Sequence, residues 1–280
     1  FGYVAFFAIG AFASAIVTLP PPGTEAYLAA NARYDVGLGQ SVAAGVLAAA
    51  VAGGLLALLI GLTSARLASH YLAVATFAMA EVLRTIFVNE TWLTRGEFGI
   101  ANVPQPLKGE TVAEAVYPYV YLGATAAIVV VLVLAAFRLG EMPFGRLLRA
   151  IRDDETAART LGKSVYGARV KALVIGGALG GVAGALWTHS LGVVHVGQFV
   201  PIITFQIWLA MLLGGVGNHW GVLGGAFLLV LIREGTRFVG DVPGLDRLAE
   251  LGPSVLPSLR FVLIGLLLIL VVRFFPRGVW

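Results

Sequence analysis

The chain has 280 residues, of which 59% are hydrophobic and only 12% are charged, and its mean hydropathy is +0.90. A soluble domain usually carries about 25% charged residues, so this composition excludes a water-soluble enzyme and a disordered chain. The sequence contains no Cys, which excludes disulfides, Fe–S clusters and thiolate metal sites. These features predict one all-α, polytopic integral membrane domain over residues 1–280.

Apolar stretches long enough to cross a bilayer, about 20 residues each, recur along the chain between loops rich in Pro and Gly. Eight are expected: Phe1–Leu19, Leu38–Leu62, Ser69–Val88, Pro118–Phe137, Arg169–Gly192, Phe199–Gly214, Trp220–Val239 and Leu256–Phe275. The Phe199–Gly214 stretch is short, so we expect it to tilt, break or re-enter. Because Phe1 already lies inside an apolar run, we also expect N-terminal helices that precede it.

Basic residues indicate the orientation of the chain in the membrane. The Arg138–Lys171 segment holds eight Lys and Arg residues against four Asp and Glu residues, and short cytoplasmic loops carry such an excess. Alternate crossing then places this segment, Arg66, Arg273 and Arg277 in the cytoplasm. It places the loops Pro20–Gly37, Asn89–Tyr117 and Gly240–Val255 outside. The net charge of +4 is therefore a topology signal, and no basic face with aromatic platforms indicates nucleic-acid binding.

Glycines spaced by four residues mark surfaces for close helix packing. One stripe contains Gly176, Gly180 and Gly184, and its neighbour contains Gly177 and Gly181. Gly217, Gly221 and Gly225 repeat the spacing. Such stripes suit either fixed packing or a surface on which helices slide, and the spacing does not separate the two.

The segment 141–165 between two spans is the most informative part of the chain. Apolar residues recur there at helical spacing: Phe144, Leu147, Leu148, Ile151, Ala158 and Leu161. Asp153 and Asp154 can cap a new helical turn, Glu155 suits its first turn, and Gly162 is a natural stop. We expect a short, exposed helix that either rests on lipid headgroups or docks into a partner protein.

The run from Arg149 to Gly162, R-A-I-R-D-D-E-T-A-A-R-T-L-G, resembles the ATPase-coupling loop of bacterial ABC permeases for branched-chain amino acids, the LivM type. That family reads R-A-I-R-E-x-E-x-A-A-x-x-L-G. Further stretches resemble the same family in order along the chain: Gly2–Ala11, Tyr71–Thr76 with Glu81–Arg84, Leu213–Gly217 with Trp220-Gly221, and Pro276-Arg277-Gly278.

This resemblance implies a permease subunit of an importer in a bacterial or archaeal cytoplasmic membrane. It implies separate ATPase subunits that hold ATP and Mg²⁺, a second related permease, an extracytoplasmic binding protein, and no cofactor in this chain. Leucine, isoleucine or valine is the implied substrate, with other amino acids, urea and short amides as alternatives. The implied coupling residues, whose exposed side chains would fit the ATPase, are Arg152, Asp153, Asp154, Glu155, Ala157, Ala158, Leu161 and Gly162.

The sequence departs from the family pattern near the expected outer mouth and pathway. Thr94–Ile100 reads T-R-G-E-F-G-I where the family has T-G-G-P-N-G-I, Gln206 stands for Glu, and Val222 stands for Pro. The candidate pathway residues are Glu81, Arg84, Gln206, Gly214, Gly215 and Gly217. Charges inside a span are functional candidates, although Glu81 and Arg84 could also form a structural pair near the outer interface.

Other chemistries are not supported. Gly162-Lys163-Ser164 imitates the end of a P-loop but lacks the first glycine and follows a helix. The four His residues, His70, His189, His195 and His219, show no metal-ligand spacing, and no nucleophile–base pair suggests an intramembrane enzyme. An ion-coupled secondary transporter is disfavoured, because nearly all charges fall at helix ends or in loops.

Overall fold

The computed structural model describes residues 2–22, 36–67, 69–106, 115–215 and 217–235, with isolated positions between 262 and 273. Several features expected from the sequence lie outside these residues. They are the Gly240–Val255 loop, most of the Leu256–Phe275 span, Arg277, the Pro276-Arg277-Gly278 motif and most of the Pro20–Gly37 loop. The chain divides into two compact units, Phe1–Pro201 and Ile202–Trp280, and each is described by itself.

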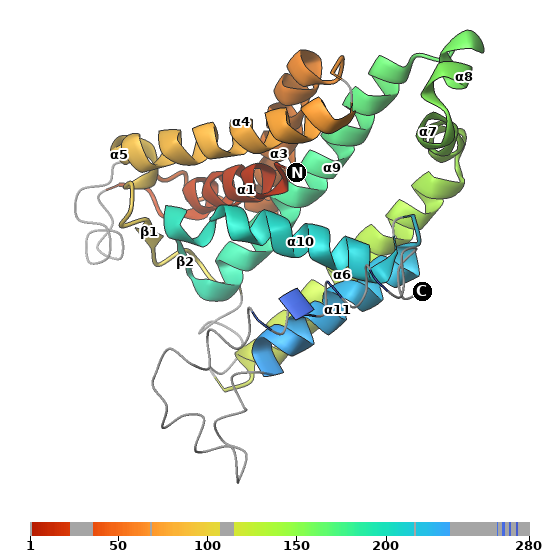
Figure 1. Ribbon diagram of the computed structural model, residues 1–280. Coiled ribbons are helices and arrows are strands. Elements are labelled where there is room, and N and C mark those ends of the chain that lie inside the picture. Colours follow the sequence, from red (N-terminus) through yellow and green to blue (C-terminus); the bar gives the residue numbers. More distant parts are fainter. Residues whose placement is uncertain are drawn as a thin grey trace. The chain divides into compact units, whose positions relative to one another are not determined.

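Helices dominate the first unit (Figure 1). Its elements are α1 (Tyr3–Thr18), α3 (Val42–Ser64), α4 (Ser69–Asn89), α5 (Thr91–Thr94), β1 (Ile100–Ala101), α6 (Tyr117–Glu141), α7 (Pro143–Asp153), α8 (Glu155–Thr160), α9 (Val165–Leu191), β2 (Val193–Val194) and the 3₁₀ turn η1 (Val196–Gln198). The second unit contains α11 (His219–Gly235) and nearly all of α10 (Pro201–Gly214).

The polytopic helical fold expected from the sequence is confirmed. Among the described residues, five segments are long and apolar enough to cross a membrane: Val42–Ser64, Tyr71–Asn89, Tyr117–Glu141, Val165–Leu191 and Val196–Gly214. Helix α1 is apolar but has 16 residues. The expected short span reaches 19 residues because η1 precedes α10 in the same apolar stretch.

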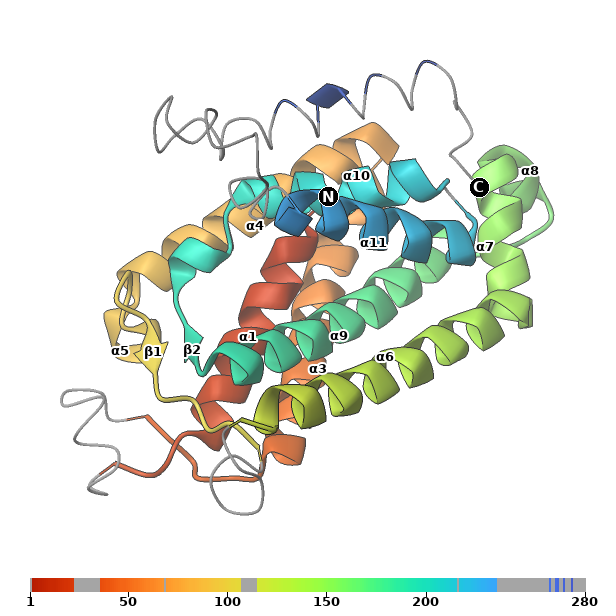
Figure 2. The ribbon, with the colours of Figure 1, turned by 90° about the horizontal axis from the view of Figure 1, so that it is seen from below.

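Helices α1, α3 and α9 form the core of the first unit and run side by side (Figure 2). The α9 glycines explain how closely they approach. A Cβ atom on Gly177 or Gly181 would collide with the α3 backbone, at Gly53 and Ala49 respectively, and one on Gly184 would collide with the Phe7 carbonyl of α1. Neighbouring glycine stripes on α9 thus face two different helices, and the absence of side chains lets the backbones approach closely enough to pack within the membrane.

One member of the expected stripe does not serve close packing. A Cβ atom on Gly176 would meet only the Tyr3 ring, at an ordinary distance of 3.9 Å, whereas one on Gly180 would press on Phe6 and Tyr3 at 3.1 and 3.2 Å. Gly176 therefore has room for a side-chain atom beside Tyr3, which is the first residue of α1.

In the second unit, α10 and α11 form a close hairpin. A Cβ atom on Gly214 would collide with the Gly221 carbonyl, and one on Gly225 with the Ala210 carbonyl. Between the helices, Gly215 and Gly217 have φ angles of +92° and +97°, which residues with a side chain rarely adopt. The glycine-rich motif therefore makes both the turn and the helix contact.

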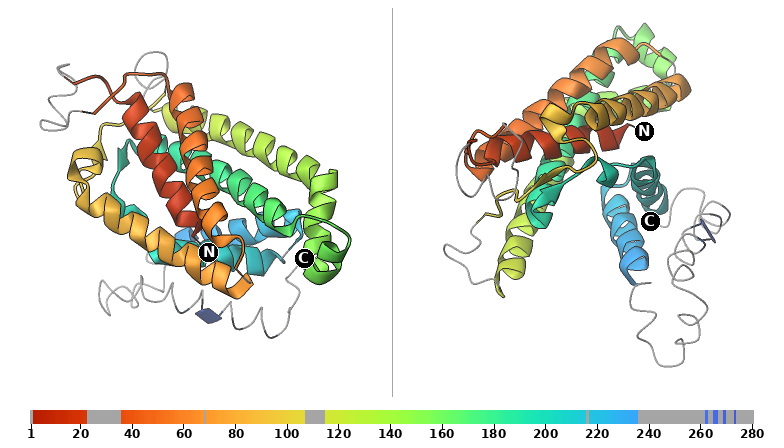
Figure 3. Two further views of the ribbon diagram at one scale, coloured as in Figure 1. Left: turned by 90° about the horizontal axis from the view of Figure 1, so that it is seen from above. Right: turned by 90° about the vertical axis from the view of Figure 1, so that its left-hand side faces the viewer.

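The first unit has two distinct ends, as the alternation of the spans predicts. At one end, the start of α9 meets the end of α3, where the Tyr166 hydroxyl donates to the Leu62 carbonyl at 3.1 Å. At the opposite end, β1 pairs antiparallel with β2, with Ile100 opposite Val194 (Figure 3). The basic segment and the Asn89–Pro106 region therefore lie at opposite ends of the helices.

Candidate coupling segment and pathway residues

The segment between α6 and α9 folds as two helices rather than one. Helix α7 ends at Asp153, and the Asp154 carboxylate caps α8 by accepting from the amides of Thr156 at 2.8 Å and Ala157 at 3.0 Å. Asp154 therefore has the capping role expected of it. Asp153 does not, because it is the last residue of α7 and pairs with Arg152 at 3.2 Å.

The end of α8 is also fixed by local interactions. Gly162 has a φ angle of +72°, and its amide donates to the Arg159 carbonyl at 2.9 Å. Two residues later, the Ser164 hydroxyl caps α9 by accepting from the Gly167 amide at 3.2 Å. Residues 161–164 therefore form the turn between α8 and α9, and each of these helices has its own cap. Helix α8 is thus a separate element.

Glu155 faces the body of the protein, which differs from the exposed position that the sequence suggests. One carboxylate oxygen accepts from Arg159 at 2.5 Å and the other from Arg169 of α9 at 2.6 Å. The Arg169 guanidinium also donates to the carbonyls of Leu67 at 3.1 Å and Ala65 at 3.4 Å, just after α3. The Arg169 side chain is 15% exposed and that of Glu155 is 31% exposed, so this cluster is partly shielded from water.

The other expected coupling residues divide into an inner and an outer set. Ala158 is buried, at 4% exposure, and holds α8 against its neighbours. Leu161, in contrast, is 77% exposed despite its apolar side chain. The remaining members are exposed as well: Arg152, Asp153, Asp154, Ala157 and Gly162. This outer set offers an apolar side chain ringed by charges, which is the composition of many docking surfaces.

The candidate pathway residues form separate groups. Glu81 and Arg84 bind each other on α4 at 2.6 Å, with side chains that are 41% and 34% exposed. Gly214, Gly215 and Gly217 lie at the α10–α11 turn, and the Gln206 side chain on α10 is half-buried. The α4 pair belongs to the first unit and the other residues belong to the second.

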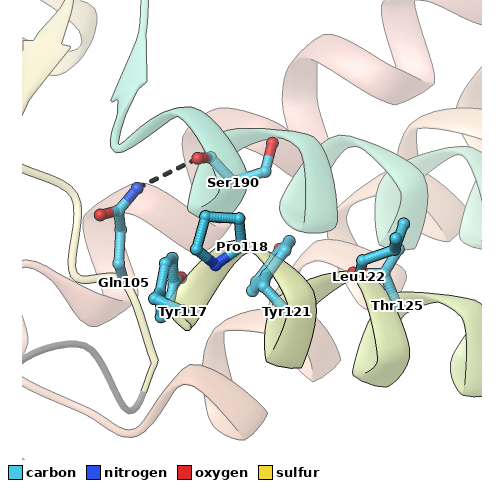
Figure 4. Close-up of a pocket in the computed structure, with 7 residues that line it drawn as sticks. All are labelled: Gln105, Tyr117, Pro118, Tyr121, Leu122, Thr125 and Ser190. Carbon is cyan, nitrogen blue, oxygen red and sulfur yellow. Dashed lines mark hydrogen bonds between the residues drawn. The ribbon is translucent and has the colours of Figure 1, made fainter. Parts of the chain in front are cut away.

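A groove of about 640 Å³ lies between α6 and the C-terminal end of α9 (Figure 4). Its lining residues are Gln105, Tyr117, Pro118, Tyr121, Leu122, Thr125 and Ser190. The Gln105 amide donates to the Ser190 carbonyl at 3.0 Å, and the Tyr121 hydroxyl to the Leu186 carbonyl at 2.5 Å. No lining residue is charged, so the groove offers no ion-pair partner to a zwitterion.

Nothing in the sequence indicates the polar cluster that joins α1, α9 and the segment after β1. His189 is 1% exposed, and its Nδ1 lies 2.7 Å from the Pro104 carbonyl while its Nε2 lies 2.8 Å from the Ser14 hydroxyl. A carbonyl only accepts, so Nδ1 carries a proton. The cluster satisfies buried polar groups. Among the described residues, no group of three His, Asp or Glu residues could hold a metal ion.

These features define a multi-pass helical membrane protein with two short helices, α7 and the capped α8, between two spans. Residues 1–272 match the family described as "Branched-chain amino acid transport system / permease component", and the chain belongs to this family. The family and the membrane location expected from the sequence are thereby confirmed. Permeases are components of transport systems rather than enzymes, which agrees with the expectation from the sequence.

Named relatives support the same family. The high-affinity branched-chain amino acid transport system permease protein LivM of Escherichia coli (strain K12) is 31% identical over 254 residues, covering 83% of this chain and 56% of the relative. The probable LivM of Methanocaldococcus jannaschii is 29% identical over 245 residues, covering 87% and 69%. A nucleoside ABC transporter permease protein, NupC of Lactococcus lactis, is 29% identical over 175 residues, covering 61% and 54%.

The chain spans little more than half the length of the Escherichia coli relative. No solved structure matches it.

Proposed function

We propose that this chain is the permease subunit of an ATP-driven importer for leucine, isoleucine or valine. ATP and Mg²⁺ would bind to separate ATPase subunits, a second related permease would complete the pathway, and an extracytoplasmic binding protein would deliver the substrate. The observation that carries the proposal is the match to the permease family over residues 1–272. The capped, exposed α8 at the basic end of the helices supports it.

In this proposal α8 is the element that binds the ATPase. Its amides and carbonyls are satisfied by Asp154 and by the turn at Gly162, so it keeps its shape without a partner. Leu161 then supplies an apolar contact, and the charges around it set the orientation of docking.

The substrate class rests on the relatives. Two of them are described as branched-chain amino acid permeases, and one as a nucleoside permease. Nucleosides are therefore an alternative substrate, beside other amino acids, urea and short amides. An ion-coupled transporter is less well supported, because the charged residues found on α4, Glu81 and Arg84, already neutralise each other.

Reconstitution of the full-length protein with the transport proteins encoded beside it tests this function. Proteoliposomes loaded with ATP should accumulate labelled leucine, and unlabelled isoleucine and valine should compete while adenosine and urea should not. An ATPase partner with an inactivated ATP site is the control. Uptake that does not depend on ATP but depends on an ion gradient would refute the proposal. Competition by adenosine alone would reassign the substrate.

The docking role of α8 has its own test. Leu161→Asp should reduce the amount of ATPase that co-purifies with the membrane subunit, because a charge would replace the exposed apolar contact. Phe98→Asp is the matched control, since Phe98 is 90% exposed and lies two residues before β1, away from α8. Equal retention of the ATPase by both variants would show that α8 is not the docking element.

A further inference from the structure

Arg169 links three segments that are distant in sequence. From α9 it binds Glu155 of α8 and, with the same guanidinium group, the carbonyls of Ala65 and Leu67. Those carbonyls belong to the short connection between α3 and α4. The arrangement uses the forked shape of the guanidinium group, because a single ammonium group could not readily reach a carboxylate and two carbonyls at once.

Helix α4 follows directly after this connection and is less enclosed than the core helices. Only 11% of its membrane-spanning window is buried, against 33% for both α3 and α9. Its outer end is packed, where Phe87 is 6% exposed and its ring centroid lies 5.0 Å from that of Phe12 on α1. From Thr76 onward α4 is packed as well, since Thr76 is 5% exposed and its carbonyl lies against Gly2. The start of α4, where Val74 is 68% exposed, is therefore the part with more freedom to move.

The two bonds of Glu155 differ in what they connect. The bond to Arg159 lies within α8, and the Arg159 side chain is 62% exposed, so water weakens it. The bond to Arg169 leaves α8 and reaches a side chain that is mostly shielded. Of the two, only the Arg169 bond joins α8 to another part of the protein.

We propose that Arg169 is a positioning residue that transmits displacement of α8 to the Ala65–Leu67 connection and thereby to the cytoplasmic end of α4. This inference rests on the proposed function, because the ATPase would supply the displacement. The core helices α1, α3 and α9 then stay packed through their glycine contacts while the first turns of α4, before Thr76, move.

The first experiment uses the reconstituted complex. The chain has no native Cys, so spin labels at Val74→Cys on α4 and Ala183→Cys on α9, both exposed positions, report the movement of α4. In the wild-type background ATP should change the distance between the labels. Arg169→Met should abolish that change and lower the substrate moved per ATP about ten-fold, the size expected from losing a charge-assisted link.

Two further variants separate transmission from a general loss of structure. Arg159→Met removes the other partner of Glu155 and should behave like the wild type in both measurements. Arg169→Lys keeps the charge but not the fork, and should restore only part of the ATP-dependent movement. A normal distance change with a normal transport-to-ATP ratio in Arg169→Met would overturn the inference.

A second experiment uses this chain without partners, so that failure of the proposed function does not decide the outcome. Hydrogen exchange at Ala73–Thr76, the second turn of α4, should be about ten-fold faster in Arg169→Met and unchanged in Arg159→Met. An unchanged rate at α4 in Arg169→Met would overturn the link itself. Absence of ATPase binding or uptake by the wild-type complex would instead refute the proposed function.

Discussion

The α9 glycines provide a test of helix packing with a matched control on the same helix. Gly181→Ala adds one methyl group where α9 meets α3, and that group would collide with the Ala49 carbonyl. Helix α1 cannot give way on the other side, because Gly10 already lies against Gly181. Gly176→Ala adds the same methyl group five residues earlier, where the nearest atom is a Tyr3 ring carbon at 3.9 Å.

The difference between these variants isolates the packing cost. Each replacement favours the helix by about 0.8–1.0 kcal/mol, because Ala has the higher helix propensity. That gain is common to both and cancels in the comparison. Overpacking a close contact costs about 1–3 kcal/mol, so Gly181→Ala should be less stable than Gly176→Ala by about this amount.

Unfolding of the purified chain in detergent, followed by circular dichroism, measures this difference. Gly176→Ala should unfold at the wild-type temperature or slightly above it, and Gly181→Ala at a lower temperature than either. Equal stability of the two variants would mean that α9 does not approach α1 and α3 as closely as the structure shows.

The other predictions concern the caps, the polar cluster and the orientation. Asp154→Ala should speed amide exchange in α8 about five-fold through loss of a cap worth about 1 kcal/mol, whereas Asp153→Ala should not; similar rates in both variants would contradict the capping geometry. His189→Leu should destabilise the chain by about 2 kcal/mol or more, because it leaves buried Ser14 and Pro104 groups without a partner, and thermal unfolding beside the control Ser190→Ala, at the half-buried neighbouring residue, measures this. Lys163→Cys should react with an impermeant maleimide only from the cytoplasmic side and Phe98→Cys only from outside; labelling of Lys163→Cys from outside would refute the topology.

Some departures from the family pattern acquire a physical meaning in the structure. Arg95 stands where the family motif has Gly, and it has a φ angle of +59° at the end of α5. Glycine adopts this conformation without strain, whereas Arg does so at some cost. The substitution therefore keeps the turn at the end of α5 and changes its side chain.

The sequence alone predicted the features that depend on neighbouring residues. Apolar length determines which segments can span a membrane, so most of the spans were recognisable without a structure. The residues that flank α8, the cap at Asp154 and the turn at Gly162, follow from capping rules that act within one turn. The resemblance of the coupling segment to a known family was equally visible, because the motif is contiguous.

Only the tertiary structure decided which surfaces meet. The spacing of the α9 glycines indicated close packing but could not show that one stripe faces α1 and the other α3, or that Gly176 has room beside it. Three contacts join different elements: Ile100 pairs with Val194, Glu155 binds Arg169, and His189 contacts Ser14. Such contacts depend on how whole helices are placed, and that placement results from the summed packing of many side chains rather than from any local pattern.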